Sequence, residues 1–123
     1  MARLDEILGF IKEYLSEFKP VIIVSEHSLE EEREYINLRI IIEQLRVLII
    51  IREYLVRGNV IAYGYYFRTR THEEWWDNRP HHPEISTYPH HKHTSGKIEP
   101  LKTPSLESIL EHIKKFLEHF LSL

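Results

Sequence analysis

The chain of 123 residues contains no cysteine, one methionine and only four glycines. Without cysteine there can be no disulfide bond, no thiolate nucleophile and no cysteine-ligated zinc. The glycines are scattered and form neither a phosphate-binding loop nor a dinucleotide-binding fingerprint. Thermolabile side chains are few while Ile, Glu, Lys and Arg are abundant, so we expect a heat-tolerant source.

Long apolar runs and an excess of positive charge are also missing. No stretch approaches the roughly eighteen apolar residues that a membrane span requires. The N-terminal segment carries acidic residues where a signal peptide has a continuous apolar run, so we expect a cytoplasmic protein that does not bind membranes. Sixteen Lys and Arg against nineteen Asp and Glu give a net charge of −3, which argues against binding nucleic acid through the overall field. The net charge does not exclude a local basic patch.

The composition that remains is that of one globular domain, residues 1–123, with 42% hydrophobic and 28% charged residues. Apolar side chains recur at helical spacing in residues 1–19 and again in residues 104–122, which predicts an amphipathic helix at each end. Pro20 ends the first helix, and Thr103 is a suitable N-cap for the second, with Pro104 at its first position.

The region between the helices changes to β-branched and aromatic residues. Four such segments with short connections lie within residues 20–69 and predict a four-stranded antiparallel meander, hence an α+β fold. In the second strand, alternation places one apolar set on a single face, which we expect to meet the helices: Ile36, Leu38, Ile40 and Ile42. Residues 47–51 are apolar at every position, so the second face also needs cover, from a homodimer, a partner protein or the segment after residue 70.

Residues 70–103 show no clean period, and we interpret them as a long His/Pro-rich loop that packs onto the domain. Five of the nine histidines of the chain lie within residues 81–93 of this loop. For any single one of them, a purely structural role and a chemical role are equal alternatives. A loop that needed only filling would use apolar side chains, so the group as a whole points to chemistry.

Two chemistries fit these histidines. In extended backbone His91 and His93 point the same way, so with His82 (or His81) they can ligate zinc, and Asp77 or Glu84 can complete the site. This metal set, His82, His91 and His93 with zinc as cofactor, is the alternative to a cofactor-free site.

In the cofactor-free interpretation, the imidazoles act as acid and base in the cleavage of RNA by its own 2′-hydroxyl. The candidate base is His81 or His82, and the candidate acid is His90, His91 or His93. Neighbouring cations would hold phosphate and aromatic rings would stack on unpaired bases. The candidate substrate-binding residues are Arg68, Trp76, Asp77, Asn78, Arg79, Tyr88 and Lys92.

The motif "WDNRPHHP" followed by "YPHHKH", ahead of a final helix introduced by "PSLESIL", resembles the TumE family of small toxins from bacterial and archaeal toxin–antitoxin modules. This resemblance implies a toxin that is neutralised by an antitoxin of the helix-turn-helix type. Ribonuclease action is a hypothesis from the residues, because the family name does not specify a target. The other alternative is a binding module without chemistry, which recognises an antitoxin through its covered sheet face and the acidic segment 26–34.

Overall fold

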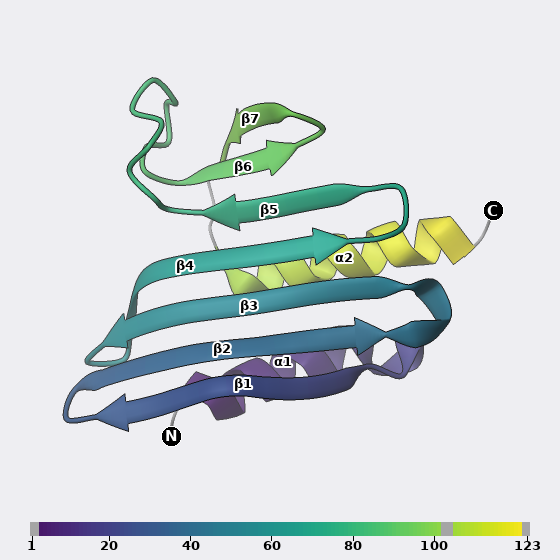
Figure 1. The fold of residues 1–123 in the computed structure, drawn as a ribbon, viewed down its shortest axis with the longest axis horizontal. Coiled ribbons are helices and arrows are strands. Elements are labelled where there is room, and N and C mark those ends of the chain that lie inside the picture. Colours follow the sequence, from purple (N-terminus) through teal and green to yellow (C-terminus); the bar gives the residue numbers. More distant parts are fainter. Residues whose placement is uncertain (1–2, 102–104, 122–123) are drawn as a thin grey trace.

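The computed structural model describes residues 3–101 and 105–121, which form a single antiparallel sheet with two helices on one of its faces (Figure 1). The seven strands follow one another across the sheet in chain order. The strands are β1 (Val21–Glu30), β2 (Arg33–Ile42), β3 (Val47–Val56), β4 (Asn59–Arg68), β5 (Glu73–Asp77), β6 (His91–Thr94) and β7 (Lys97–Pro100). The helices are α1 (Arg3–Leu15) and α2 (Leu106–Leu121), with short 3-10 turns at Ser16–Phe18 and Glu43–Leu45.

The predicted four-stranded meander is therefore wrong, although the α+β class agrees with the structure. Strands β5, β6 and β7 extend the sheet through the region that we interpreted as a long loop. These strands are only four or five residues long, and their inward and outward positions hold Glu, Asp, His and Lys as well as Trp. A strand is usually detected by alternation of apolar and polar residues. These strands lack that alternation because polar side chains, held by ionic contacts, occupy inward positions.

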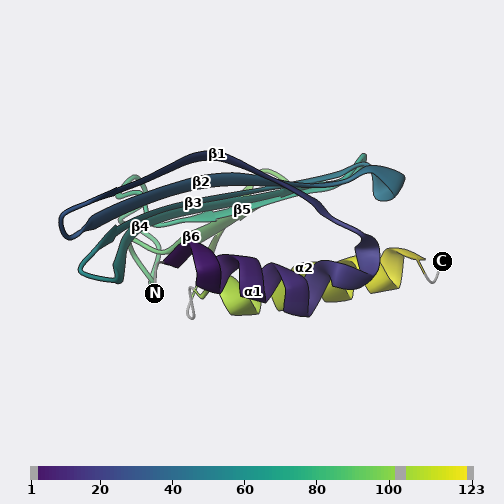
Figure 2. The same cartoon turned by 90° about the horizontal axis from the view of Figure 1, so that it is seen from below.

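The two helices lie side by side against the same face of the sheet (Figure 2). They correspond to the two helices expected at the chain ends, and α1 is followed by a 3-10 turn whose C-cap, Lys19, has a positive φ of 56° ahead of Pro20. The expected cap at Thr103 and Pro104 lies outside the described residues. None of the helices in the described ranges is long and apolar enough to span a bilayer.

The hydrophobic core lies between the helices and the inner face of the sheet. As predicted, Ile36, Leu38, Ile40 and Ile42 of β2 are all fully buried there. Alternate residues of β3 and of the C-terminal half of β4 join them, and α1 and α2 contribute their apolar stripes, as in Ile11 of α1. The core thus fixes the register of the long strands, because a one-residue slip would turn this set outward.

The opposite face of the sheet, which we call the open face, is covered by neither of the two helices within residues 3–101 and 105–121 (Figure 2). Strand pairing places two rows of side chains across it, from β2 to β6. One row is Asn37, Arg52, Gly64, Asp77 and His91, and the other is Arg39, Ile50, Tyr66, Trp75 and His93. Both rows end at histidines of β6, so the sheet itself brings the C-terminal part of the "YPHHKH" motif beside residues that are distant in sequence.

Tight turns close the hairpins at the ends of these strands. Arg57 and Gly58 between β3 and β4, and Ser95 and Gly96 between β6 and β7, all have positive φ. Two-residue turns of this kind match the twist of the strands that they join, and glycine adopts positive φ without steric cost. The β5–β6 connection is different, because it is a thirteen-residue loop, residues 78–90.

Candidate functional site

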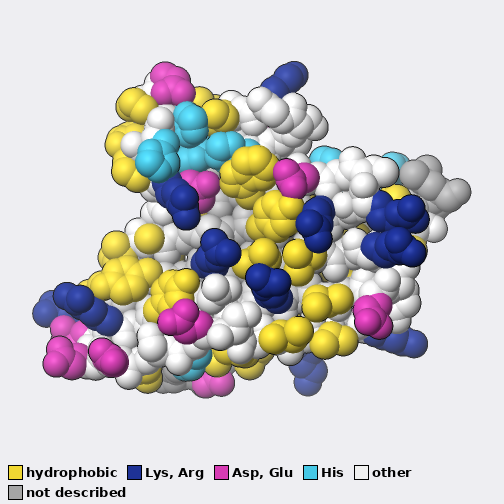
Figure 3. Space-filling view, in the orientation of Figure 1, with side chains coloured by type: hydrophobic (Ala, Val, Ile, Leu, Met, Phe, Trp, Pro, Cys, Tyr) yellow, Lys and Arg dark blue, Asp and Glu magenta, His cyan; other side chains and the backbone are white. Residues whose placement is uncertain are grey.

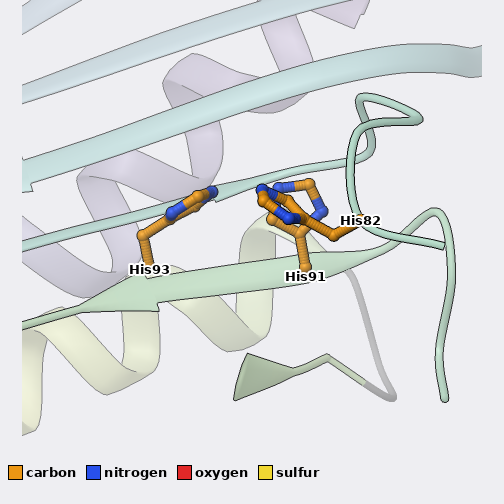
Figure 4. A group of neighbouring side chains, drawn as sticks. All are labelled: His82, His91 and His93. Atoms are coloured by element: carbon orange, nitrogen blue, oxygen red, sulfur yellow. The ribbon is translucent and has the colours of Figure 1, made fainter. Parts of the chain in front are cut away.

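Three histidines converge where the loop 78–90 folds back over β6. The possible ligand nitrogens of His82, His91 and His93 all lie within 4.8 Å of one another. We call this group the histidine triad. His91 and His93 project from the same face of β6, as alternation requires, and His82 reaches them from the loop (Figure 4). The three rings meet edge to face, with centroids 4.8 to 5.7 Å apart.

His91 is the most deeply placed member of the triad, with 3% of its side chain exposed. Its Nδ1 lies 2.9 Å from the carbonyl oxygen of Pro89, and a carbonyl only accepts, so Nδ1 carries a hydrogen. Its Nε2 lies 3.0 Å from Oδ1 of Asp77. A proton on Nε2 would let the ring donate to the carboxylate, and a cation between the two groups would join them in the same way.

His93 is held by its neighbour on the sheet. Its ring stacks on the indole of Trp75 with centroids 4.4 Å apart and an interplanar angle of 15°. Burial, together with the nearby His91 and His82 rings, lowers the pKa of His93, and the Asp77 carboxylate acts in the opposite direction. The neutral form of His93 is thus favoured, and this is the form that accepts a proton or binds a cation.

His82 and Asp77 complete the cluster from opposite sides. His82 has Nδ1 3.3 Å from Oε1 of Glu84, and 25% of its side chain is exposed. Asp77, at the end of β5, accepts a hydrogen bond of 3.0 Å from the backbone N–H of Arg79. Both groups are therefore oriented by a residue two positions further along the chain.

The other two histidines of the loop are not part of this group. His81 is exposed. His90 stacks on Tyr63, and its Nδ1 is 2.9 Å from the tyrosine hydroxyl. Of the five candidate catalytic histidines, the structure thus brings three together and separates two.

A groove adjoins the triad on the open face. It has a volume of about 670 Å³, and Asp77 and Trp75 line it at the end nearest the triad. Gly64 lies in the row that crosses the groove, and a Cβ built on it would meet nothing within 4 Å. The missing side chain therefore leaves open space between Arg52 and Asp77 rather than allowing a close backbone approach.

The groove is lined by aromatic rings and cations. Tyr54, Tyr66 and Trp75 contribute aromatic surface, and Arg52 and Arg79 contribute positive charge. The histidines gather at one end of this face, and Lys and Arg side chains are interspersed with Asp and Glu side chains over the rest of it (Figure 3). In the groove itself, Arg52 and Arg79 share the lining with the carboxylates of Glu53, Glu73 and Asp77.

The candidate substrate-binding residues divide between the two faces of the sheet. Asp77, Asn78 and Arg79 line the groove. Lys92 does not, because it points to the helix side. Trp76 is 3% exposed and contributes only to the wall of the groove. Arg68 and Tyr88 are exposed and lie outside the groove.

A second ionic cluster lies on the helix side of β5 and centres on Glu74, which is 3% exposed. Nε2 of His72 lies 2.5 Å from its carboxylate, Nζ of Lys92 2.8 Å and Nε2 of His112 on α2 3.0 Å. Burial alone would raise the pKa of Glu74, but the hydrogen bonds from His112, Lys92 and His72 outweigh it and lower the pKa to about 2. This cluster ties α2 to the β5–β6 pair behind the triad.

The chain matches a known protein family. The family model described as Toxin TumE matches residues 10–121, nearly the whole sequence. The chain belongs to the TumE family. No curated protein and no solved structure gives a significant match.

Membership of the TumE family suggests a toxin of a toxin–antitoxin module, and with it an antitoxin partner. The resemblance seen in the sequence is thereby confirmed. The match also runs through both parts of the site, since it includes β5 with Asp77 and β6 with His91 and His93.

Sequence reasoning missed several residues of this TumE site. Trp75, rather than Trp76, presents its ring to the open face, and Arg52 and Gly64 were not singled out. The available signal was the dipeptide Ser95-Gly96, which indicates a tight hairpin and would have placed strands on both sides of it. Once β6 is a strand, its pairing with β5 fixes which of the two tryptophans shares a face with His93.

Proposed function

We propose that this TumE-family toxin cleaves single-stranded RNA, with the histidine triad at the scissile phosphate and the open-face groove as the binding site for the strand. The observation that carries the proposal is that Asp77 and Trp75, which contact His91 and His93 of the triad, also line a groove with Tyr66 and arginine side chains. Bases of a single strand stack on aromatic rings, and cations hold its backbone.

The reaction is an internal transesterification. The 2′-hydroxyl loses its proton to a group at the triad, and the 2′-oxygen forms a bond to phosphorus. The bond from phosphorus to the 5′-oxygen breaks, and that oxygen gains a proton. The products are one strand that ends in a 2′,3′-cyclic phosphate and one that begins with a 5′-hydroxyl, so protons and electrons balance without any further reactant.

Geometry narrows the acid–base assignment made from the sequence. His81 and His90 lie apart from the triad, and both nitrogens of His91 already have partners, the carbonyl of Pro89 and the carboxylate of Asp77. Only His82 and His93 then remain to meet a substrate directly, with side chains 25% and 17% exposed. A candidate acid or base must reach the transferred proton, which favours these two residues.

The test compares the His93→Ala and His82→Ala variants with His81→Ala, a matched change in the same loop outside the triad. Expression in cells and incubation with a defined single-stranded RNA provide two measurements, growth inhibition and cleavage. We expect both triad variants to lose at least about 100-fold in cleavage rate, the usual scale of acid–base catalysis, and to lose toxicity. His81→Ala should retain both.

Unchanged cleavage in folded His82→Ala and His93→Ala proteins would contradict the proposal. Circular dichroism and the melting temperature establish that each variant is folded. Loss of cleavage in His81→Ala to the same extent would also contradict it, because the effect would then not be specific to the triad.

The alternative, a protein-binding role, has one specific observation in its favour, the edge strand β1. Its ten residues are all exposed and include Val21, Ile22, Ile23 and Val24, and no strand of the described residues pairs with the side of β1 away from β2. Exposed apolar edge strands readily accept a further strand from a partner. The acidic residues from Glu26 to Glu32 at the β1–β2 end add negative charge. We therefore propose β1 as the contact for a basic segment of the antitoxin, which we propose, from the family resemblance, to be of the helix-turn-helix type.

A further inference from the structure

We propose that the histidine triad, together with Asp77, binds one divalent transition-metal ion of the class that prefers imidazole ligands, for which Zn²⁺ is the probe. Four potential ligand groups come from three separate segments, β5, the loop 78–90 and β6. Three imidazoles with one carboxylate form a donor set that suits zinc without cysteine.

The spacing of the rings suits a shared metal ion. Ligand nitrogens about 2.1 Å from one tetrahedral zinc ion lie about 3.4 Å apart. One nitrogen of each triad ring lies within 4.8 Å of a nitrogen of the other two, so a small movement of the rings would bring all three to a single ion.

The second nitrogen of two of these rings is already engaged, as metal sites require. Nδ1 of His91 donates to the carbonyl of Pro89, and Nδ1 of His82 faces the carboxylate of Glu84. Each contact fixes the tautomer that leaves Nε2 with its lone pair free for an ion. His93 gains its orientation from the stacked indole of Trp75 instead.

Asp77 supplies the negative charge of the site. Its Oδ1 is 3.0 Å from Nε2 of His91, and its Oδ2 is 3.8 Å from Nε2 of His93. A cation that touches the carboxylate and Nε2 of His91 removes the repulsion between their lone pairs. The backbone N–H of Arg79 on Oδ1 holds the carboxylate in this position, as the hydrogen-bonded ligands of metal centres are held.

The ion would also serve the reaction, and this consequence rests on the proposed function. His82, His91, His93 and Asp77 would hold the ion, and its positive charge would stabilise the phosphate oxygens as negative charge develops on them. Metal binding itself does not depend on that function.

The experiment uses the full chain, purified without a histidine tag, stripped with a chelator and titrated with Zn²⁺. We expect one zinc per chain by elemental analysis and calorimetry. Cobalt(II) loading should give the visible absorption of a tetrahedral nitrogen–oxygen site. The His82→Ala and His93→Ala variants should bind at least about 100-fold more weakly, and Asp77→Asn about 10–100-fold more weakly.

The matched control is the variant with both His81→Ala and His90→Ala, two histidines of the same loop that lie outside the triad. It should bind zinc as the wild type does. Equal binding by the wild type and by a folded His82→Ala, His93→Ala double variant would overturn the inference, because the ion would then sit elsewhere. Failure of the wild type to bind zinc or cobalt would overturn it as well.

Activity separates this inference from the proposed function. RNA cleavage that persists at full rate in metal-stripped protein with excess chelator contradicts the metal site and leaves the ribonuclease proposal intact. Stoichiometric zinc at the triad without cleavage of any RNA supports the metal site and contradicts the ribonuclease proposal.

Discussion

At the scale of single residues, Gly64 is the position at which the groove can be changed without touching the triad. It lies within β4, and a Cβ atom built there would have no neighbour within 4 Å. Valine suits a strand and would fill the groove between Arg52 and Asp77. We expect Gly64→Val to weaken RNA binding by about tenfold, which corresponds to the loss of roughly one stacked base, with little change in melting temperature.

Fluorescence anisotropy with a short single-stranded RNA measures this effect. Gly64→Ala is the matched control, because one methyl group leaves most of the space open and should retain nearly full affinity. Equal affinities for the wild type and Gly64→Val would show that the strand does not cross the groove.

Some single residues of the site could be predicted from the sequence, and others could not. The pairing of His91 with His93 followed from alternation along an extended "HHKH" segment, whereas the sequence leaves the third ligand open between His81 and His82. The roles of Trp75 and Gly64 did not follow from the sequence, since they depend on the pairing of β4 with β5 and of β5 with β6. Such pairing is a long-range property that no local pattern specifies.

At the scale of elements, the Glu74 cluster joins α2 to β5 and β6 and should make stability depend on pH. The folded pKa of Glu74 is lowered to about 2 from an ordinary value of 4.5. A lowered carboxyl pKa stabilises the fold fully above the unfolded pKa, and this contribution is lost as the pH falls toward the folded pKa. The stabilisation by Glu74 should therefore be complete above about pH 5 and disappear between about pH 5 and pH 2.

Chemical denaturation of the wild type and Glu74→Gln over this pH range tests the linkage. The variant should be less stable near neutral pH, and the difference between the two proteins should shrink steadily below about pH 5. Glu99→Gln, on the exposed strand β7, is the matched control and should follow the wild type. A difference that stays constant down to pH 2 would contradict the assigned contacts.

The same cluster explains why elements β5 to β7 escaped detection. In β5 the inward positions are Glu74 and Trp76, so the core-facing side of this strand is half polar. The buried carboxylate is acceptable only because His72, Lys92 and His112 pair with it, and these partners come from a preceding turn, a later strand and the last helix. The sequence of β5 alone contains none of that information.

At the scale of the whole molecule, the sequence predicted the core well, because helices and long strands bury apolar faces of clear period. The apolar run 47–51 also predicted that the second face of the sheet, which holds Leu48 and Ile50, is covered. In the structure this face is the open face, and Ile50 lines the groove there. The structure also leaves the β1 edge without a neighbouring strand among the described residues. Partners rather than further elements of the described chain are expected at both places.

For the edge strand, we predict that Ile23→Lys weakens antitoxin binding at least about tenfold, because a charge would enter an apolar strand contact. Co-expression followed by calorimetry with the purified antitoxin measures this. Thr71→Lys, an exposed change away from β1, should bind as the wild type does. If Ile23→Lys leaves antitoxin affinity unchanged but converts a dimer to a monomer, β1 instead joins two copies of the toxin.

The central claim, that the triad cleaves RNA by way of its own 2′-hydroxyl, is tested most directly by the chemistry of the cut ends. A defined single-stranded RNA is incubated with the wild type, and its fragments are analysed by mass spectrometry beside an otherwise identical RNA with 2′-O-methyl groups. The account predicts 2′,3′-cyclic phosphate and 5′-hydroxyl ends, no cutting of the methylated strand, and no cutting by His93→Ala. Fragments with 5′-phosphate ends, or equal cutting of the methylated strand, would contradict it.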